Sequence, residues 1–78
     1  MYKNGVVYPN LEAEIVRAGI NRGELMRLLG LRRTALYNKL IGSSKMTLNE
    51  MNTLQTYLEL KTGKQFTLEY LFEKNETI

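Results

Sequence analysis

Apolar positions of this chain recur every third or fourth residue, which is helical spacing, from residue 11 to residue 72. They fall into five groups, each the apolar face of an expected helix: Leu11, Ile15 and Ala18; Leu25, Leu28 and Leu29; Leu36 and Leu40; Leu48, Met51, Leu54 and Leu58; and Leu68, Leu71 and Phe72. Residues 1–8 lack this period and are expected to form a short N-terminal arm. The pattern predicts an all-α fold, a compact five-helix bundle over residues 9–73, followed by a flexible tail over residues 74–78.

Start signals precede the expected helices. Asn10 is the expected N-cap of the first helix, with Glu12 and Glu14 in its first turn, where the helix dipole favours acidic side chains. Asn21 and Glu24 have the spacing of a capping box, so the second helix should begin between them.

Stop signals and further caps complete this outline. Gly30 stands where a left-handed C-terminal cap ends the second helix, and a third helix is expected from about residue 33 to residue 41. Thr47 and Glu50 form another capping box at the start of a fourth helix, and Thr67 caps a short fifth one.

Basic residues concentrate in the middle of the chain. Between Arg17 and Lys45, seven basic residues face one acid, Glu24, so this segment carries +6, whereas the segments before and after it carry −1 and −2. A basic centre with acidic flanks indicates one surface that faces a polyanion. The alternative is an ordinary solvated surface.

The composition excludes several kinds of chemistry. The 78 residues include no Cys and no His, which excludes disulfides, zinc fingers and His-based catalysis. No glycine-rich phosphate loop is present, and Glu12 and Glu14, two residues apart on one helix, face different directions. We therefore expect no enzymatic activity, no metal and no cofactor. With no bilayer-spanning segment and no secretory signal in the sequence, the expected location is the cytoplasm.

Residues 22–42 resemble the helix-turn-helix of phage repressor and Cro proteins. The resemblance rests on the spacing of Leu25, Leu29, Gly30, Leu31, Leu36 and Gly42. In that family these positions are, in order, core, core, turn glycine, core after the turn, core of the recognition helix, and closing glycine. The resemblance covers about residues 9–73 and implies a lambda repressor-like DNA-binding domain. A chain of 78 residues is expected to be Cro-like, without a second, ligand-sensing domain.

The chain departs from this family at three positions. Arg22 replaces a usual Gln, and Met26 replaces a small Ala that normally lets the two helices approach closely. Arg32 replaces a Ser or Thr cap at the start of the recognition helix. A cation there is unfavourable by ~0.3–1 kcal/mol because the helix dipole is positive at that end. The presence of two adjacent cations, Arg32 and Arg33, at this end of the helix is explained if a phosphate or a guanine edge neutralises them.

Three side chains match the family's base-reading positions: Arg33, Thr34 and Asn38. Arg grips guanine O6 and N7, Asn grips adenine N6 and N7, and a Thr methyl meets a thymine methyl. Tyr37 is a further candidate, which stacks along a sugar or reaches a base. The alternatives are a solvated helix surface for Arg33 and Asn38, a local cap for Thr34, and cover for a neighbouring apolar patch for Tyr37.

Phosphate contacts are expected on both sides of the recognition helix. Arg22 is the leading candidate, because backbone N–H groups at the start of its helix also reach a phosphate. Its alternative is a plain first-turn residue. Weaker candidates are Arg32, Lys39, Ser43, Ser44 and Lys45. For Lys39, the alternative is that its aliphatic stem covers the core.

These residues predict sequence-specific binding of double-stranded DNA by a small transcriptional regulator, of phage or prophage origin, at the nucleoid of a bacterial host. One recognition helix reads few base pairs, so a homodimer is expected, with Phe66, Leu68 and Tyr70 at its contact surface. The alternative is a protein that is monomeric in solution and pairs only on DNA, in which Phe66 only packs on Leu71. The alternative function is a helical protein-interaction module, such as an anti-repressor or antitoxin.

Overall fold

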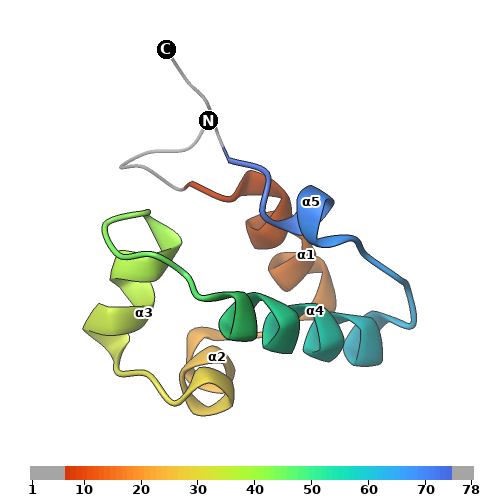
Figure 1. Ribbon diagram of the computed structural model, residues 1–78. Helices are drawn as coiled ribbons and strands as arrows, with labels where there is room; N and C mark the ends of the chain where they lie inside the picture. Colours follow the sequence, from red (N-terminus) through yellow and green to blue (C-terminus); the bar gives the residue numbers. More distant parts are fainter. Residues whose placement is uncertain (1–6, 75–78) are drawn as a thin grey trace.

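The computed structural model describes residues 7–74, which form five helices and no strand (Figure 1). The helices are α1 (Pro9–Ala18), α2 (Arg22–Leu29), α3 (Arg33–Leu40), α4 (Leu48–Thr62) and α5 (Leu68–Leu71). The expected all-α bundle of five helices is confirmed. The N-terminal arm predicted over residues 1–8 and the tail predicted over residues 74–78 lie outside the described residues, except for Val7, Tyr8 and Lys74.

Both predicted capping boxes are formed. At α2, the Glu24 N–H donates to Asn21 Oδ1 (2.8 Å) and the Asn21 N–H donates to Glu24 Oε1 (3.2 Å). At α4, the Glu50 N–H donates to Thr47 Oγ1 (3.1 Å) and the Thr47 N–H donates to Glu50 Oε1 (2.9 Å). Each box satisfies backbone donors that the first turn of a helix leaves free, so the starts of α2 and α4 are fixed locally.

The start of α1 differs from the prediction. Pro9 is the first helical residue and Tyr8 is its cap, because a proline at the first position loses no intrahelical hydrogen bond. Asn10 lies inside the helix, and its side-chain amide donates to the Tyr70 carbonyl (2.9 Å). Glu14 is not in the first turn; its side chain lies buried against α5, with the residue 4% exposed.

The core is built around α1, α4 and α5 and reaches α2 and α3. Its buried apolar members are Tyr8, Leu11, Ile15, Ile20, Leu25, Leu36, Met46, Leu54, Leu58 and Leu71. Tyr8, which the sequence assigned to the arm, belongs to this core, and its ring meets Phe72 edge-on at 5.4 Å. Leu48 was expected to face inward but is 63% exposed. At about 100° per residue, it lies roughly a quarter turn away from the row of Leu58.

Helix α3 stands at the side of the bundle (Figure 1). Among the helices of residues 7–74, it packs closely against α2 alone, whereas α4 packs against α1, α2 and α5. Gly30 turns the chain between α2 and α3 with φ +66°, and the Leu31 N–H donates back to the Met26 carbonyl (3.0 Å). This bond closes the left-handed cap expected there. Helix α3 therefore presents much of its surface to solvent.

Candidate nucleic-acid interface

The N-terminal end of α3 is basic, exposed and uncapped. Arg32 is the cap residue, and its side chain makes no capping hydrogen bond. Arg32, Arg33 and Thr34 are all exposed, and the first turn of α3 holds no acidic residue. Thr34 is the second residue of the helix, so it does not occupy the cap position that was its alternative role. The free N–H groups and the two guanidinium groups thus give this end of α3 a concentrated positive charge.

Arg22 lies close to this end of α3. A cleft of about 440 Å³ separates the start of α2 from α3, and Arg22, Arg33 and Tyr37 line it together. Its apolar lining comes from Met26, Leu36 and Leu40. Tyr37 is 53% exposed, so it does not cover an apolar patch completely. The structure therefore brings the leading phosphate candidate and the first base-reading candidate to one cleft.

A neighbouring carboxylate holds Arg22 at the rim of this cleft. Glu12 of α1 accepts a hydrogen bond from Arg22 Nη2 at 3.3 Å. The Arg22 side chain remains about half exposed in this pair. A surface ion pair of this kind contributes little to stability, so the guanidinium stays accessible to a stronger anion such as a phosphate.

The loop after α3 folds back onto the helix. The Ser44 N–H donates to the Asn38 carbonyl (3.1 Å), which places the loop beside the last turn of α3. Ser43, Ser44 and Lys45 are exposed, whereas Asn38 is half-buried. Gly42 makes the turn with φ +87°, and a Cβ at that position would lie 3.0 Å from a Val7 methyl carbon. The left-handed backbone therefore favours glycine at this closing position of the predicted motif, and the close Val7 side chain adds to that preference.

Lys39 differs from the other predicted phosphate contacts. Its ammonium donates to Glu50 Oε1 (2.9 Å) and to the Lys45 carbonyl (3.0 Å), and its side chain is 15% exposed. Burial alone would raise the pKa of Glu50. The hydrogen bond from the Thr47 N–H and the adjacent Lys39 ammonium outweigh burial and hold that pKa below its ordinary value. Glu50 thus stays ionised beside Lys39. The sequence pattern gave no signal for this pair, because the partners lie 11 residues apart on different helices.

The segment around α3 is free of acidic residues. None lies between Glu24 and Glu50, whereas this stretch carries Arg27, Arg32, Arg33, Lys39 and Lys45. Glu50 is itself engaged by Lys39, and Glu24 by the Tyr57 hydroxyl (2.6 Å). Among the exposed residues of α3 and its flanking turns, Arg32, Arg33 and Lys45 are basic and none is acidic, which favours contact with a polyanion.

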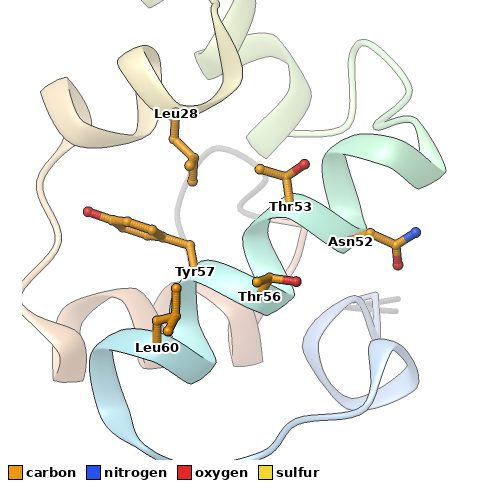
Figure 2. A pocket seen from close by; sticks show the side chains of 6 residues that line it. All are labelled: Leu28, Asn52, Thr53, Thr56, Tyr57 and Leu60. Carbon is orange, nitrogen blue, oxygen red and sulfur yellow. The ribbon is translucent and has the colours of Figure 1, made fainter.

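A second concave surface lies between α2 and α4 (Figure 2). It encloses about 360 Å³ and is lined by Leu28, Asn52, Thr53, Thr56, Tyr57 and Leu60. Leu60 is 77% exposed at its rim. The sequence pattern did not reveal this groove, although Leu60 follows Leu58 by two residues and so cannot share the buried face of α4.

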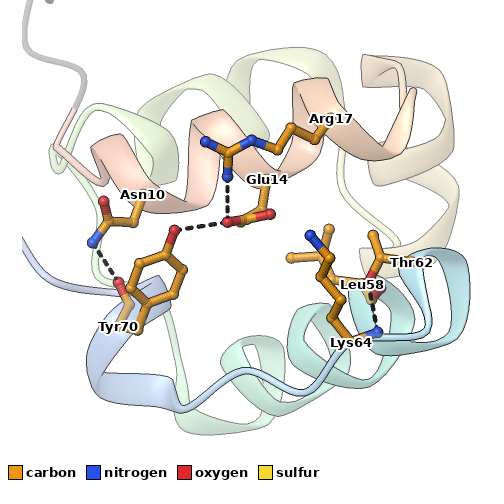
Figure 3. Close-up of polar contacts among 7 residues, drawn as sticks. All are labelled: Asn10, Glu14, Arg17, Leu58, Thr62, Lys64 and Tyr70. Carbon is orange, nitrogen blue, oxygen red and sulfur yellow. Dashed lines mark hydrogen bonds and ion pairs between the residues drawn. The ribbon is translucent and has the colours of Figure 1, made fainter.

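Tyr70, one of the three residues predicted to form a dimer surface, makes polar contacts within the protomer (Figure 3). The Tyr70 hydroxyl donates to Glu14 Oε2 (2.7 Å), which also accepts from Arg17 Nη1 (2.6 Å). The hydrogen bond to Glu14 is the main cause that raises the pKa of Tyr70. The ring of Tyr70 stacks on that of Phe66, with centroids 6.2 Å apart, and Phe66 and Leu68 are half-buried. These contacts hold Tyr70 and Phe66 within the protomer, and Tyr70 remains 37% exposed.

Two structural findings bear on other kinds of site. Within residues 7–74, no three side chains of the metal-binding types His, Cys, Asp and Glu come together. None of the helices described combines the length and apolar character that crossing a membrane requires. Comparison of the chain with protein families, with characterised proteins and with solved structures found no match.

Proposed function

We propose that the protein binds double-stranded DNA by placing α3 in the major groove, and that it acts as a small transcriptional regulator. The observation that carries this proposal is the exposed, uncapped N-terminal end of α3, which carries Arg32 and Arg33 and no acidic residue, with Arg22 beside it. An α-helix fits the major groove, and the N-terminal residues of a recognition helix are those that reach base edges.

The base contacts in this proposal come from one side of α3. Arg33 reads guanine, Asn38 reads adenine and Thr34 contacts a thymine methyl, with Tyr37 alongside them. The phosphate contacts flank them, at Arg22 on α2, at Arg32 before α3, and in the loop of residues 43–45. This arrangement separates residues that specify sequence from those that position the helix.

The unfavourable charge at the start of α3 supports the proposal. In the free protein, Arg32 and Arg33 repel each other and oppose the dipole of α3, at a cost of ~0.3–1 kcal/mol for each cation. A DNA phosphate or a guanine edge beside the two guanidinium groups turns this unfavourable electrostatic energy into a favourable one. A side-chain pattern that costs stability in the free state and gains it with an anion is typical of a functional site.

The groove between α2 and α4 favours a second candidate function. Leu28, Tyr57 and Leu60 offer apolar surface that a helix of another protein could cover. In this alternative the protein is an interaction module, such as an anti-repressor or antitoxin. The lining is neutral, so binding there would depend weakly on salt, whereas DNA binding by counterion release falls steeply.

Selection of bound sequences from a random duplex pool at low salt tests the proposed function. We expect enrichment of a defined sequence, and weaker enrichment with Arg33→Ala. Glu69→Ala, at an exposed position on α5, is the matched control and should select the same sequence as the unaltered protein. Recovery of an unselected pool would remove the support for sequence-specific DNA binding.

A further inference from the structure

Helix α3 has few supports for an element that must be placed accurately. Among the helices described, it packs closely against α2 alone. At its C-terminal end, Leu40 packs against the core, and two backbone hydrogen bonds add to this contact. The Val7 N–H donates to the Leu40 carbonyl (3.3 Å), and the Ser44 N–H donates to the Asn38 carbonyl. Whatever holds this end therefore determines the angle at which α3 leaves the bundle.

Lys39 joins three parts of the chain at this end. Its backbone belongs to α3, and its ammonium donates to Glu50 on α4 and to the Lys45 carbonyl in the connecting loop. Its side chain and that of Glu50 are 15% and 16% exposed. Because water is largely excluded from both groups, the pair is stronger and less screened by salt than an exposed ion pair.

The Glu50 side chain is also held by the capping box at the start of its own helix. Its Oε1 atom accepts from the Thr47 N–H in the capping box (2.9 Å) and from Lys39 Nζ (2.9 Å). The carboxylate therefore has one orientation, set by the start of α4. Because the Lys39 ammonium binds this fixed carboxylate, the position of α4 constrains the position of α3.

We propose that the Lys39–Glu50 pair is the tie that sets the position of α3, and that Lys39 is a positioning residue for DNA binding rather than a phosphate contact. This inference rests on the proposed function. The tie also holds the loop that carries Ser43, Ser44 and Lys45, since the Lys45 carbonyl is one of its acceptors. Lys39 therefore places both base-reading and phosphate-binding groups while contacting neither kind of target.

The two roles of Lys39 predict opposite results for two variants. Lys39→Met keeps the apolar stem and removes the ammonium, and Glu50→Gln keeps an acceptor for the cap and removes the charge. If Lys39 positions α3, each variant weakens binding to the selected duplex by about three- to tenfold, and the double variant is no weaker than either single one. If Lys39 contacts a phosphate, Glu50→Gln frees it and does not weaken binding.

The decisive experiment measures duplex affinity against salt for these variants and for Lys45→Met. Lys45 is the matched control, a nearby lysine whose side chain is exposed. Its loss should flatten the slope of log K against log salt by about one unit, as expected for a phosphate contact. We expect the slope to be unchanged for Lys39→Met. A slope flattened by about one unit in Lys39→Met, or unweakened binding by Glu50→Gln, would overturn the proposal.

Amide hydrogen exchange of the DNA-free protein separates this inference from the proposed function. Both pair variants should speed exchange in the last turn of α3 by about three- to tenfold, whereas Lys45→Met should not. Unchanged exchange in the pair variants would overturn the tie even if the protein binds DNA. If exchange is faster in the pair variants but the protein binds no duplex, the Lys39–Glu50 pair still positions α3. The proposed function, and with it the role of Lys39 in DNA binding, would then be wrong.

Discussion

Gly30 offers a direct test of the turn that joins α2 to α3. Its backbone is left-handed, with φ +66° and ψ +35°. A Cβ added there would meet no heavy atom within 4 Å, so the Cβ itself adds no clash to the cost of a substitution. The cost is the backbone strain of an L-residue in the left-handed region, roughly 1–2 kcal/mol, and a β-branched side chain lies at the upper end. We therefore expect Gly30→Val to destabilise the protein by about 2 kcal/mol.

Thermal unfolding followed by circular dichroism measures this effect. For a domain of this size, 1 kcal/mol corresponds to about 4–8 °C, so Gly30→Val should lower Tm by about 8–16 °C. Gly30→Asn is the matched control, because Asn adopts the left-handed conformation at lower cost, and it should lower Tm less than Gly30→Val. DNA affinity should fall with stability, since the turn places α3. Equal Tm values for the unaltered protein and Gly30→Val would show that the strain reasoning is wrong.

Three further predictions follow from the site. Arg33→Ala should cost ~1–3 kcal/mol in binding free energy on the selected duplex and relax preference at one base pair, as read from competition with single-base variants. Arg22→Ala should weaken all duplexes about equally and flatten the salt slope by about one unit; altered base preference would instead show that the assigned register is wrong. The hydrogen bond from the Tyr57 hydroxyl, and after it the one from the Asn21 N–H, lower the pKa of Glu24 below its ordinary 4.5. The ionised carboxylate therefore stabilises the folded state above pH 4.5, and this contribution is lost as pH falls through the lower folded pKa. Denaturant unfolding between pH 3 and pH 6 should show this loss, and Glu24→Gln should reduce it.

Local signals explain why much of the fold could be predicted. The capping boxes at Asn21 and Thr47 and the glycine at residue 30 act through neighbours within a few residues, so a sequence pattern contains all of their partners. The buried positions Leu25, Leu36, Leu54 and Leu58 follow from the same short-range periodicity. The start of α1 was misplaced because Pro9 and Asn10 are both good start signals, and only tertiary contact showed that the Asn10 amide bonds to Tyr70.

Contacts between distant residues explain what the sequence could not show. The partners in the Tyr70–Glu14 hydrogen bond are 56 residues apart, and their pairing accounts for an aromatic side chain that the sequence suggested for a dimer surface. Lys39 and Glu50 likewise lie on different helices, so nothing in the pattern distinguished Lys39 from exposed lysines such as Lys45. The exposed candidates at the start of α3 could be named because exposure there follows from local polarity.

The salt dependence of binding to a selected duplex tests the central proposal most directly. Fluorescence anisotropy with a labelled duplex gives the affinity at several salt concentrations. With ~4–6 phosphates neutralised per protomer, log K should fall against log salt with a slope of about −4 to −5. A slope near zero, or no binding to any selected duplex at low salt, would contradict DNA binding through the basic surface of α3.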